Sequence, residues 1–111
     1  MSKKTGYVYL LGDWEKEHMY KIGVTTGSIE RRIKKLQTGN SGEIYLVKYY
    51  ETEHPFFTEA RLHQRFHKEK VLNEWFELSD DDVKNFKKYC DDIEEIVKVM
   101  KNNPFFPKNL K

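Results

Sequence analysis

Arg32 interrupts the apolar face of a predicted helix. Ile29, Ile33 and Leu36 follow the i, i+4, i+7 spacing of a buried stripe, and Arg32 occupies its i+3 position. The same helical phase turns Arg31 outward. We therefore expect Arg32, and not Arg31, to face the body of the protein, where a guanidinium is suited to a phosphate or a carboxylate.

A second helical stretch repeats this pattern. Leu62 and Phe66 belong to a stripe whose other members are Glu59 and His63. Burying an unpaired charge is costly, so these groups must pair, bind a metal or line a cleft. Two interpretations have equal weight: an Arg32–Glu59 ion pair inside the fold with a hydrogen-bonded His63, or a functional site.

Two strands carry further polar groups on one face. Side chains alternate along a strand, so Ile22 and Val24 share one face and Lys21 and Gly23 share the other. If the β-branched faces meet the helices, Tyr9 and Lys21 lie together on the opposite face or at its rim. A tyrosine and a lysine beside a glycine are candidates for a site, although each alone is typical of packing or of solvated surface.

The elements that would position these residues follow from periodicity and turn residues. Strands are expected at 7–11, 19–25 and 43–51, helices at 29–37, 55–68 and 79–101, and an extended piece at 73–78. Short connections favour antiparallel neighbours. The predicted fold class is α+β, with a three-stranded, largely antiparallel sheet flanked by helices and a C-terminal helix.

Length and composition indicate one globular domain. The chain has 111 residues, of which 38% are hydrophobic and 34% charged, without the signature of disorder. Residues 1–111 are expected to form this single domain: a core at 6–78, the C-terminal helix at 79–101 and an irregular tail at 102–111. The sequence shows no signal-peptide pattern and no apolar stretch of membrane-spanning length, so we expect a cytoplasmic protein, intracellular in a host if viral.

Charge and cysteine content narrow the function further. Cys90 is the single cysteine, which excludes a disulfide within the chain and disfavours a cysteine-based zinc site. The net charge of +2 does not by itself indicate a nucleic-acid partner. The basic residues Arg31, Lys34 and Lys35 are nevertheless clustered on one helix.

Several of these residues occur in an ordered set of short motifs. The motifs are Tyr7-Val8-Tyr9, Lys21-Ile22-Gly23, Arg32, Glu59-x-x-Leu62-His63 and Glu74-Trp75-Phe76, within residues 6–78. Together they resemble the GIY-YIG nuclease superfamily, in particular its small phage, viral and microbial branch with Lys-Ile-Gly as the second motif. Two residues depart from the superfamily pattern: Tyr7 replaces a glycine and Lys21 replaces a tyrosine. Asn73 stands nearest to the family's late asparagine.

The resemblance implies a metal-dependent endonuclease that hydrolyses DNA phosphodiester bonds. Glu59 would be the protein ligand of Mg²⁺ or Mn²⁺. Arg32 would brace the scissile phosphate. Tyr9, its pKa lowered by the metal, Lys21 and Arg32, would take a proton from the attacking water. His63 would orient Glu59 or shuttle protons.

A DNA-binding module that does not cut is the first rival to a nuclease. Arg31, Lys34 and Lys35, with exposed tyrosines, would grip the DNA, and the replacement of tyrosine by Lys21 keeps this rival function open. Glu74 is a weaker candidate for the site in either case.

A zinc protein and a structural protein would use different residues. Glu59, His63 and His67 at i, i+4, i+8 would suit a zinc ion on one helix face. A structural or interaction protein would instead use the third helix, through the seam Val83, Phe86, Cys90, Ile93, Val97 and Met100. We expect that seam to cover the domain's own core, and hence a monomer rather than a homodimer.

Overall fold

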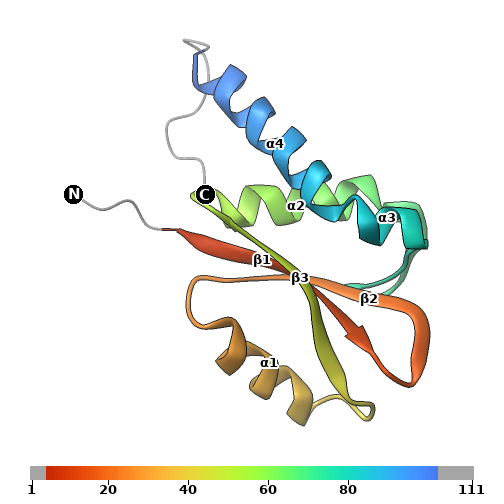
Figure 1. The fold of residues 1–111 in the computed structure, drawn as a ribbon. Coiled ribbons are helices and arrows are strands. Elements are labelled where there is room, and N and C mark those ends of the chain that lie inside the picture. The colour runs from red at the N-terminus through yellow and green to blue at the C-terminus, as the bar shows by residue number, and fades with distance from the viewer. Residues whose placement is uncertain (1–4, 103–111) are drawn as a thin grey trace.

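A five-stranded sheet lies between helices on both of its faces (Figure 1). The structure, a computed structural model, describes residues 5–102. The elements are β1 (Gly6–Asp13), β2 (Lys16–Thr25), α1 (Ile29–Thr38), β3 (Ile44–Thr52), α2 (Pro55–Arg65), a 3₁₀ turn η1 (His67–Glu69), β4 (Lys70–Leu72), β5 (Trp75–Glu77), α3 (Asp80–Lys84) and α4 (Phe86–Lys101). Helix α1 covers one face, and α2 and α4 cover the other.

The strand order is β3-β1-β2-β5-β4, and each neighbouring pair is antiparallel. The α+β class predicted from the sequence is confirmed, but the prediction of three strands is wrong. Strands β4 and β5 form a second hairpin that joins the sheet along β2. Each has only three residues, too few to show a period of two.

The turn between β4 and β5 depends on Asn73, whose φ of 54° lies in the left-handed region that asparagine tolerates. Helix α2 ends at Arg65 rather than continuing to Lys68 as predicted. The chain passes through η1 before it enters β4. This earlier end brings residues 70–77 back to the sheet.

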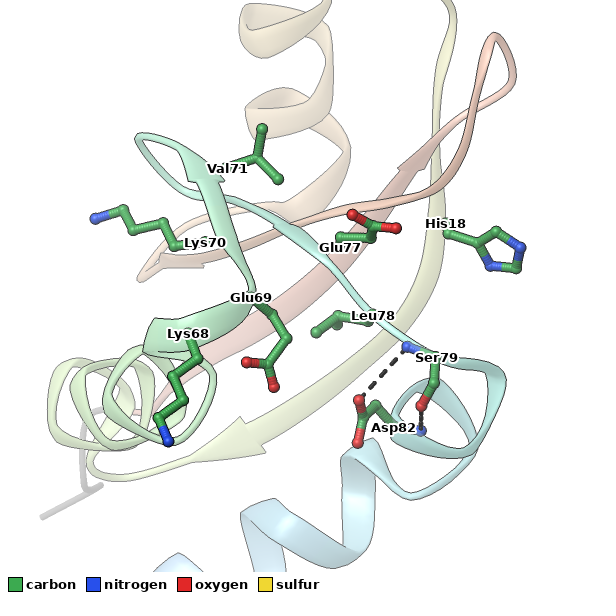
Figure 2. Close-up of a pocket in the computed structure, with 9 residues that line it drawn as sticks. All are labelled: His18, Lys68, Glu69, Lys70, Val71, Glu77, Leu78, Ser79 and Asp82. Atoms are coloured by element: carbon green, nitrogen blue, oxygen red, sulfur yellow. Dashed lines mark hydrogen bonds between the residues drawn. The ribbon is translucent and has the colours of Figure 1, made fainter.

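The predicted single helix at 79–101 is two helices. Ser79 and Asp82 form the expected capping box at its start: Asp82 N–H donates to Ser79 Oγ at 3.1 Å, and Ser79 N–H donates to the Asp82 carboxylate (Figure 2). The chain bends at Asn85, which ends α3 and precedes α4. Asparagine interrupts helices because its side chain competes for backbone hydrogen bonds. Most of the tail predicted to be irregular, 103–111, lies outside the described residues.

The core has two unequal parts. The larger part lies between the sheet and α2 and α4, and its fully buried members include Val8, Leu62 and Phe86. The smaller part lies under α1, where Tyr9, Leu11 and Ile44 are buried and Ile33, Leu36 and Trp75 pack against them. Four of the six residues of the predicted seam, Phe86, Cys90, Ile93 and Val97, are buried in α4, as expected for a helix that covers its own domain, whereas Val83 in α3 and Met100 are half-buried.

Candidate active site

The pairing of β2 with β5 ends in the middle of β2. Lys21 is opposite Trp75, and the last bond runs from Ile22 N–H to the Glu74 carbonyl oxygen at 3.2 Å. Beyond it, Gly23 and the residues up to Thr25 have β1 on one side and no described strand on the other. Side chains from both faces of the sheet approach this part of β2, which we call the open edge.

Tyr9 and Arg32 meet at the open edge on the α1 face. Tyr9 is opposite Gly23, and a Cβ added at Gly23 would come within 2.5 Å of the ring carbon Cζ of Tyr9. A glycine at this position therefore leaves room for the phenol. Arg32 Nε–H donates to Tyr9 Oη at 3.2 Å. Arg32 is half-buried and Arg31 exposed, so the helical phase predicted for this pair is confirmed.

Tyr9 is completely buried, and this burial raises the pKa of its hydroxyl above the ordinary value. The hydrogen bond and the positive charge of Arg32 lower the pKa by less, and the carboxylates of Glu74 and Glu59 raise it. Arg32 lowers the pKa of Tyr9 as expected, but the expected net lowering is wrong for the chain's own residues, because burial raises the pKa by more. The cost of desolvating a phenolate exceeds the attraction of the nearby charges. Tyr9 is a neutral phenol at neutral pH.

Lys21 lies on the same face and is held by the β4–β5 hairpin. Its Nζ is 3.2 Å from Glu74 Oε1 and 5.7 Å from the centre of the Trp75 ring. The Lys21 side chain is only 13% exposed, whereas that of Glu74 is 41% exposed. The β4–β5 hairpin thus supplies Glu74 as the counter-ion of Lys21, and Glu74 is the more exposed partner of this ion pair.

Glu59 and His63 come from α2, on the other face of the sheet. His63 Nε2–H donates to the Ile22 carbonyl oxygen at 3.0 Å, and its ring packs edge-on against Phe76. Because a carbonyl can only accept, Nε2 carries the proton of this bond, and in the neutral ring Nδ1 has the lone pair. His63 is therefore hydrogen-bonded, as the first interpretation has it, and this bond is equally compatible with a functional role. The Arg32–Glu59 ion pair of that first interpretation is wrong, because the described ion pairs include none between these residues and Arg32 binds Tyr9 instead.

Glu59 is half-buried, and this burial is the main cause that raises the pKa of its carboxyl above the ordinary value. His63, Arg32 and Lys21 lower that pKa, and Glu74 raises it. All five predicted catalytic residues and Glu74 are therefore close enough to share one electrostatic environment. The charge of Glu59 is only partly compensated by its neighbours.

The other predicted residues lie outside this cluster. Arg31, Lys34 and Lys35 are exposed on α1. His67 is exposed, and its Nδ1 lies 3.0 Å from the Gln64 carbonyl oxygen. Residues 5–102 contain no group of three histidine, cysteine or acidic side chains that could hold a metal, so Glu59, His63 and His67 do not gather as a zinc site would require. Asn73 is exposed in the β4–β5 turn and has a conformational role there.

Trp75 is the residue of this region that sequence reasoning gave no function. It packs against the smaller core and lies beside Lys21. Its place in the motif Glu74-Trp75-Phe76 could have marked Trp75 as a site residue. In a strand, alternation places the side chains of Trp75 and Phe76 on opposite faces of the sheet. Without the pairing of β5 with β2, that alternation did not say which residues Trp75 would meet.

A separate hollow of about 550 Å³ lies between the β4–β5 hairpin and α3 (Figure 2). Figure 2 shows Lys68 and Glu69 on one side of it and Ser79 and Asp82 on the other. None of the predicted site residues lines this hollow. The hydrogen bonds between Ser79 and Asp82 in its wall are the capping bonds of α3, which stabilise the start of that helix.

Comparison with known proteins gives one match. The model of the T5orf172 domain matches residues 6–100. The assignment to the GIY-YIG superfamily made from the motifs is therefore wrong: the family found for these residues is the T5orf172 domain, a nuclease-like, DNA-binding family. No curated protein and no solved structure matches the chain. Within residues 5–102, no helix has the length and apolar character needed to cross a bilayer.

Proposed function

The chain belongs to the T5orf172 domain family, and from this and the open-edge cluster we propose that it is a metal-assisted endonuclease that hydrolyses DNA phosphodiester bonds. The observation that carries the proposal is the position of Glu59. It is a half-buried carboxylate, only partly compensated, that shares its surroundings with Arg32 and Lys21. A carboxylate beside two cations is suited to hold a metal ion while the cations bind a phosphate.

The donor atoms fit a hard divalent cation. Glu74 raises the cost of ionising Glu59, as its effect on the pKa of Glu59 indicates, and a cation bound at Glu59 would relieve that cost. Mg²⁺ and Mn²⁺ are commonly bound through one or two carboxylates and otherwise by water. When bound, such an ion supplies Lewis-acid stabilisation of the phosphate and acidifies a water molecule.

Arg32 is the residue we assign to the phosphate. Its Nε is engaged by Tyr9, which leaves the two terminal amino groups of the guanidinium for phosphate oxygens. Tyr9 is completely buried behind it and has a raised pKa, so we assign Tyr9 a positioning role: its Oη fixes the direction of Arg32. Lys21 adds positive charge on the same side.

His63 is the residue we assign to the proton of the attacking water. Its Nε2–H is fixed on the Ile22 carbonyl, so the lone pair of Nδ1 is free to accept a proton. Once protonated, His63 would place a positive charge beside Glu59, which lowers the pKa of that carboxyl. Both side chains come from α2, so one rigid element would orient the carboxylate and the base together.

A DNA-binding module that does not cut is the second candidate, and the Lys21–Glu74 ion pair favours it. This contact of 3.2 Å already neutralises two of the charged groups that catalysis would use. In that case the exposed Arg31, Lys34 and Lys35 would carry the binding of DNA.

Metal-dependent nicking separates the two candidates. Purified protein is incubated with supercoiled and with linear DNA in Mg²⁺, in Mn²⁺ and in EDTA. We expect cleavage with either cation, and its loss in Glu59→Ala and in His63→Gln but not in the matched control His67→Gln. Binding without cleavage by the parent protein would favour the DNA-binding module, and wild-type cleavage by Glu59→Ala would refute the metal assignment.

Tyr9→Phe tests whether the hydroxyl of Tyr9 positions Arg32 or accepts a proton. It keeps the ring and removes the group that holds Arg32. A positioning role predicts a loss of about 10- to 100-fold in kcat with an unchanged shape of the pH profile. A proton-accepting role predicts nearly complete loss, together with disappearance of the limb of the pH profile that reports the base.

A further inference from the structure

A small cavity adjoins the candidate active site under the C-terminal half of α1. Its volume is about 230 Å³, and it lies between α1 with its C-cap and strands β2, β3 and β5. Its walls include Lys21 and Trp75 from the sheet, Lys35, Leu36 and Asn40 from the α1 side, and Ile44 from β3. None of the interactions assigned to the reaction above needs this space.

The cavity is in line with the phosphate site. Lys21 belongs to both, and Lys35 and Leu36 follow Arg32 by three and four residues. They therefore lie about one helical turn, roughly 5.4 Å, further along α1 on the side of Arg32. A group in the cavity would be adjacent to a phosphate held by Arg32.

The walls combine an aromatic ring, aliphatic carbon and positive charge. Trp75, Leu36 and Ile44 would contact a flat apolar group, and Lys35 would attract an anion attached to it, whereas the charge of Lys21 is shared with Glu74. Both hydrogens of Asn40 Nδ2 are used, on Asp13 Oδ2 at 2.9 Å and on the Gly42 carbonyl at 2.7 Å. These bonds fix the amide and leave its oxygen as an acceptor.

Size and chemistry together select a single nucleobase. The cavity is smaller than the roughly 300 Å³ at which sites for drug-sized molecules begin, so it admits one ring system. A bare phosphate would gain nothing from Trp75, Leu36 and Ile44. A nucleobase carries the flat face, the hydrogen-bonding edge and the neighbouring phosphate that these walls suit.

We propose that this cavity holds one unpaired nucleobase next to the phosphate bound by Arg32, and hence that the substrate is single-stranded or locally unpaired DNA. The inference rests on the proposed function. A base inside a duplex is stacked and paired, and it would have to be flipped out to pass under α1. Single strands avoid that cost.

Fluorescence of Trp75 reports occupancy of the cavity directly. The chain has two tryptophans, and Trp14 lies in the β1–β2 turn, stacked on Tyr45 rather than in the cavity. Trp14→Phe keeps an aromatic ring there and leaves Trp75 as the sole tryptophan. This protein is titrated in EDTA with a single strand about 12 nucleotides long, its duplex and a strand of the same length whose sites are all abasic. Anisotropy of labelled strands shows saturation, and the wild-type protein is assayed in parallel for cleavage of the same strands with Mg²⁺.

We expect the single strand to quench Trp75 emission by about half or more and to bind at least about tenfold tighter than the abasic strand. The reciprocal protein, Trp75→Phe, reports Trp14 and should show no quenching. Unchanged Trp75 emission at saturation, or equal quenching by duplex, overturns the inference, while cleavage by the wild-type protein would still support the proposed function. Quenching by single strands without cleavage supports the base site and refutes the nuclease. If the strands neither bind nor are cut, both proposals fail.

Discussion

The two faces of the sheet are built for different tasks. Under α2 and α4, buried apolar side chains such as Val8, Leu62 and Phe86 form a continuous core. Under α1, the buried part is small, and its largest member, Tyr9, bears a hydroxyl that binds Arg32. Helix α1 has no buried residue, whereas α4 has four. Apolar burial stabilises a fold in proportion to area, so most of the stability comes from the α4 side.

The two faces meet at the open edge of β2. There Glu59 and His63 approach β2 from α2, and Tyr9, Lys21 and Arg32 lie on the α1 side of the sheet. Four of these five groups stand on β1, β2 or α2, each of which contributes buried side chains to the larger core, and Arg32 alone comes from α1. The comparison indicates that a site of partly compensated charges can form on a thinly packed face when the opposite face carries the stability.

The largest expected effect concerns the unequal cores. Phe86→Ala should lower the free energy of unfolding by about 3–5 kcal/mol, because it removes a completely buried ring. Ile33→Ala, on the α1 side, should cost only about 1–2 kcal/mol, because Ile33 is half-buried. Urea titration followed by circular dichroism measures both. Equal losses would show that α1 contributes as much to stability as α4.

The next effect concerns the two neighbouring arginines of α1. Arg32→Ala should lower kcat by about 10²–10³-fold, because it removes the group assigned to the phosphate in the transition state. Arg31→Ala should leave kcat nearly unchanged, weaken DNA binding and reduce its salt dependence by about one counterion. Kinetics on the same DNA at several salt concentrations test both variants, and similar kcat losses in the two would contradict the assignment.

The smallest effect concerns the cost of the Glu59 charge. The pKa of Glu59 in the folded chain is raised above its ordinary value of 4.5, so the folded protein binds the proton more tightly than the unfolded chain does. Stability therefore falls as pH rises from 4.5 through the folded pKa, and Glu59 is unfavourable above it. Glu59→Gln should raise Tm by roughly one to four degrees at neutral pH, and the gain should vanish below about pH 4.5.

Thermal melts between about pH 4 and 8 in EDTA, with the exposed Glu43→Gln as the matched control, measure this difference. Mg²⁺ should then raise the Tm of the parent protein and not that of Glu59→Gln, since a ligand that binds the folded state stabilises it. A lower Tm for Glu59→Gln than for the parent at neutral pH would show that Glu59 is a structural residue.

Much of the fold and part of the site could be predicted from local patterns. The phase of the α1 stripe placed Arg32 inward and Arg31 outward, and the α2 stripe placed Glu59 and His63 beside Leu62; the structure confirms both. The capping box at Ser79 was visible because its two residues are three apart. These features depend on helical geometry within a few residues, which a sequence displays directly.

The sequence by itself determined which side chains each element presents to the interior, because periodicity within an element needs no other part of the chain. Only the tertiary structure decided what those side chains meet. The pairing of β5 with β2, between residues more than fifty positions apart, brought Glu74 to Lys21 and placed Trp75 beside it. Desolvation, which depends on every atom packed around a group, set the direction of the Tyr9 pKa against the nearby positive charge. Long-range pairing and burial are properties of the assembled fold. Strands of three residues, such as β4 and β5, are too short for their periodicity to predict which strand they pair with.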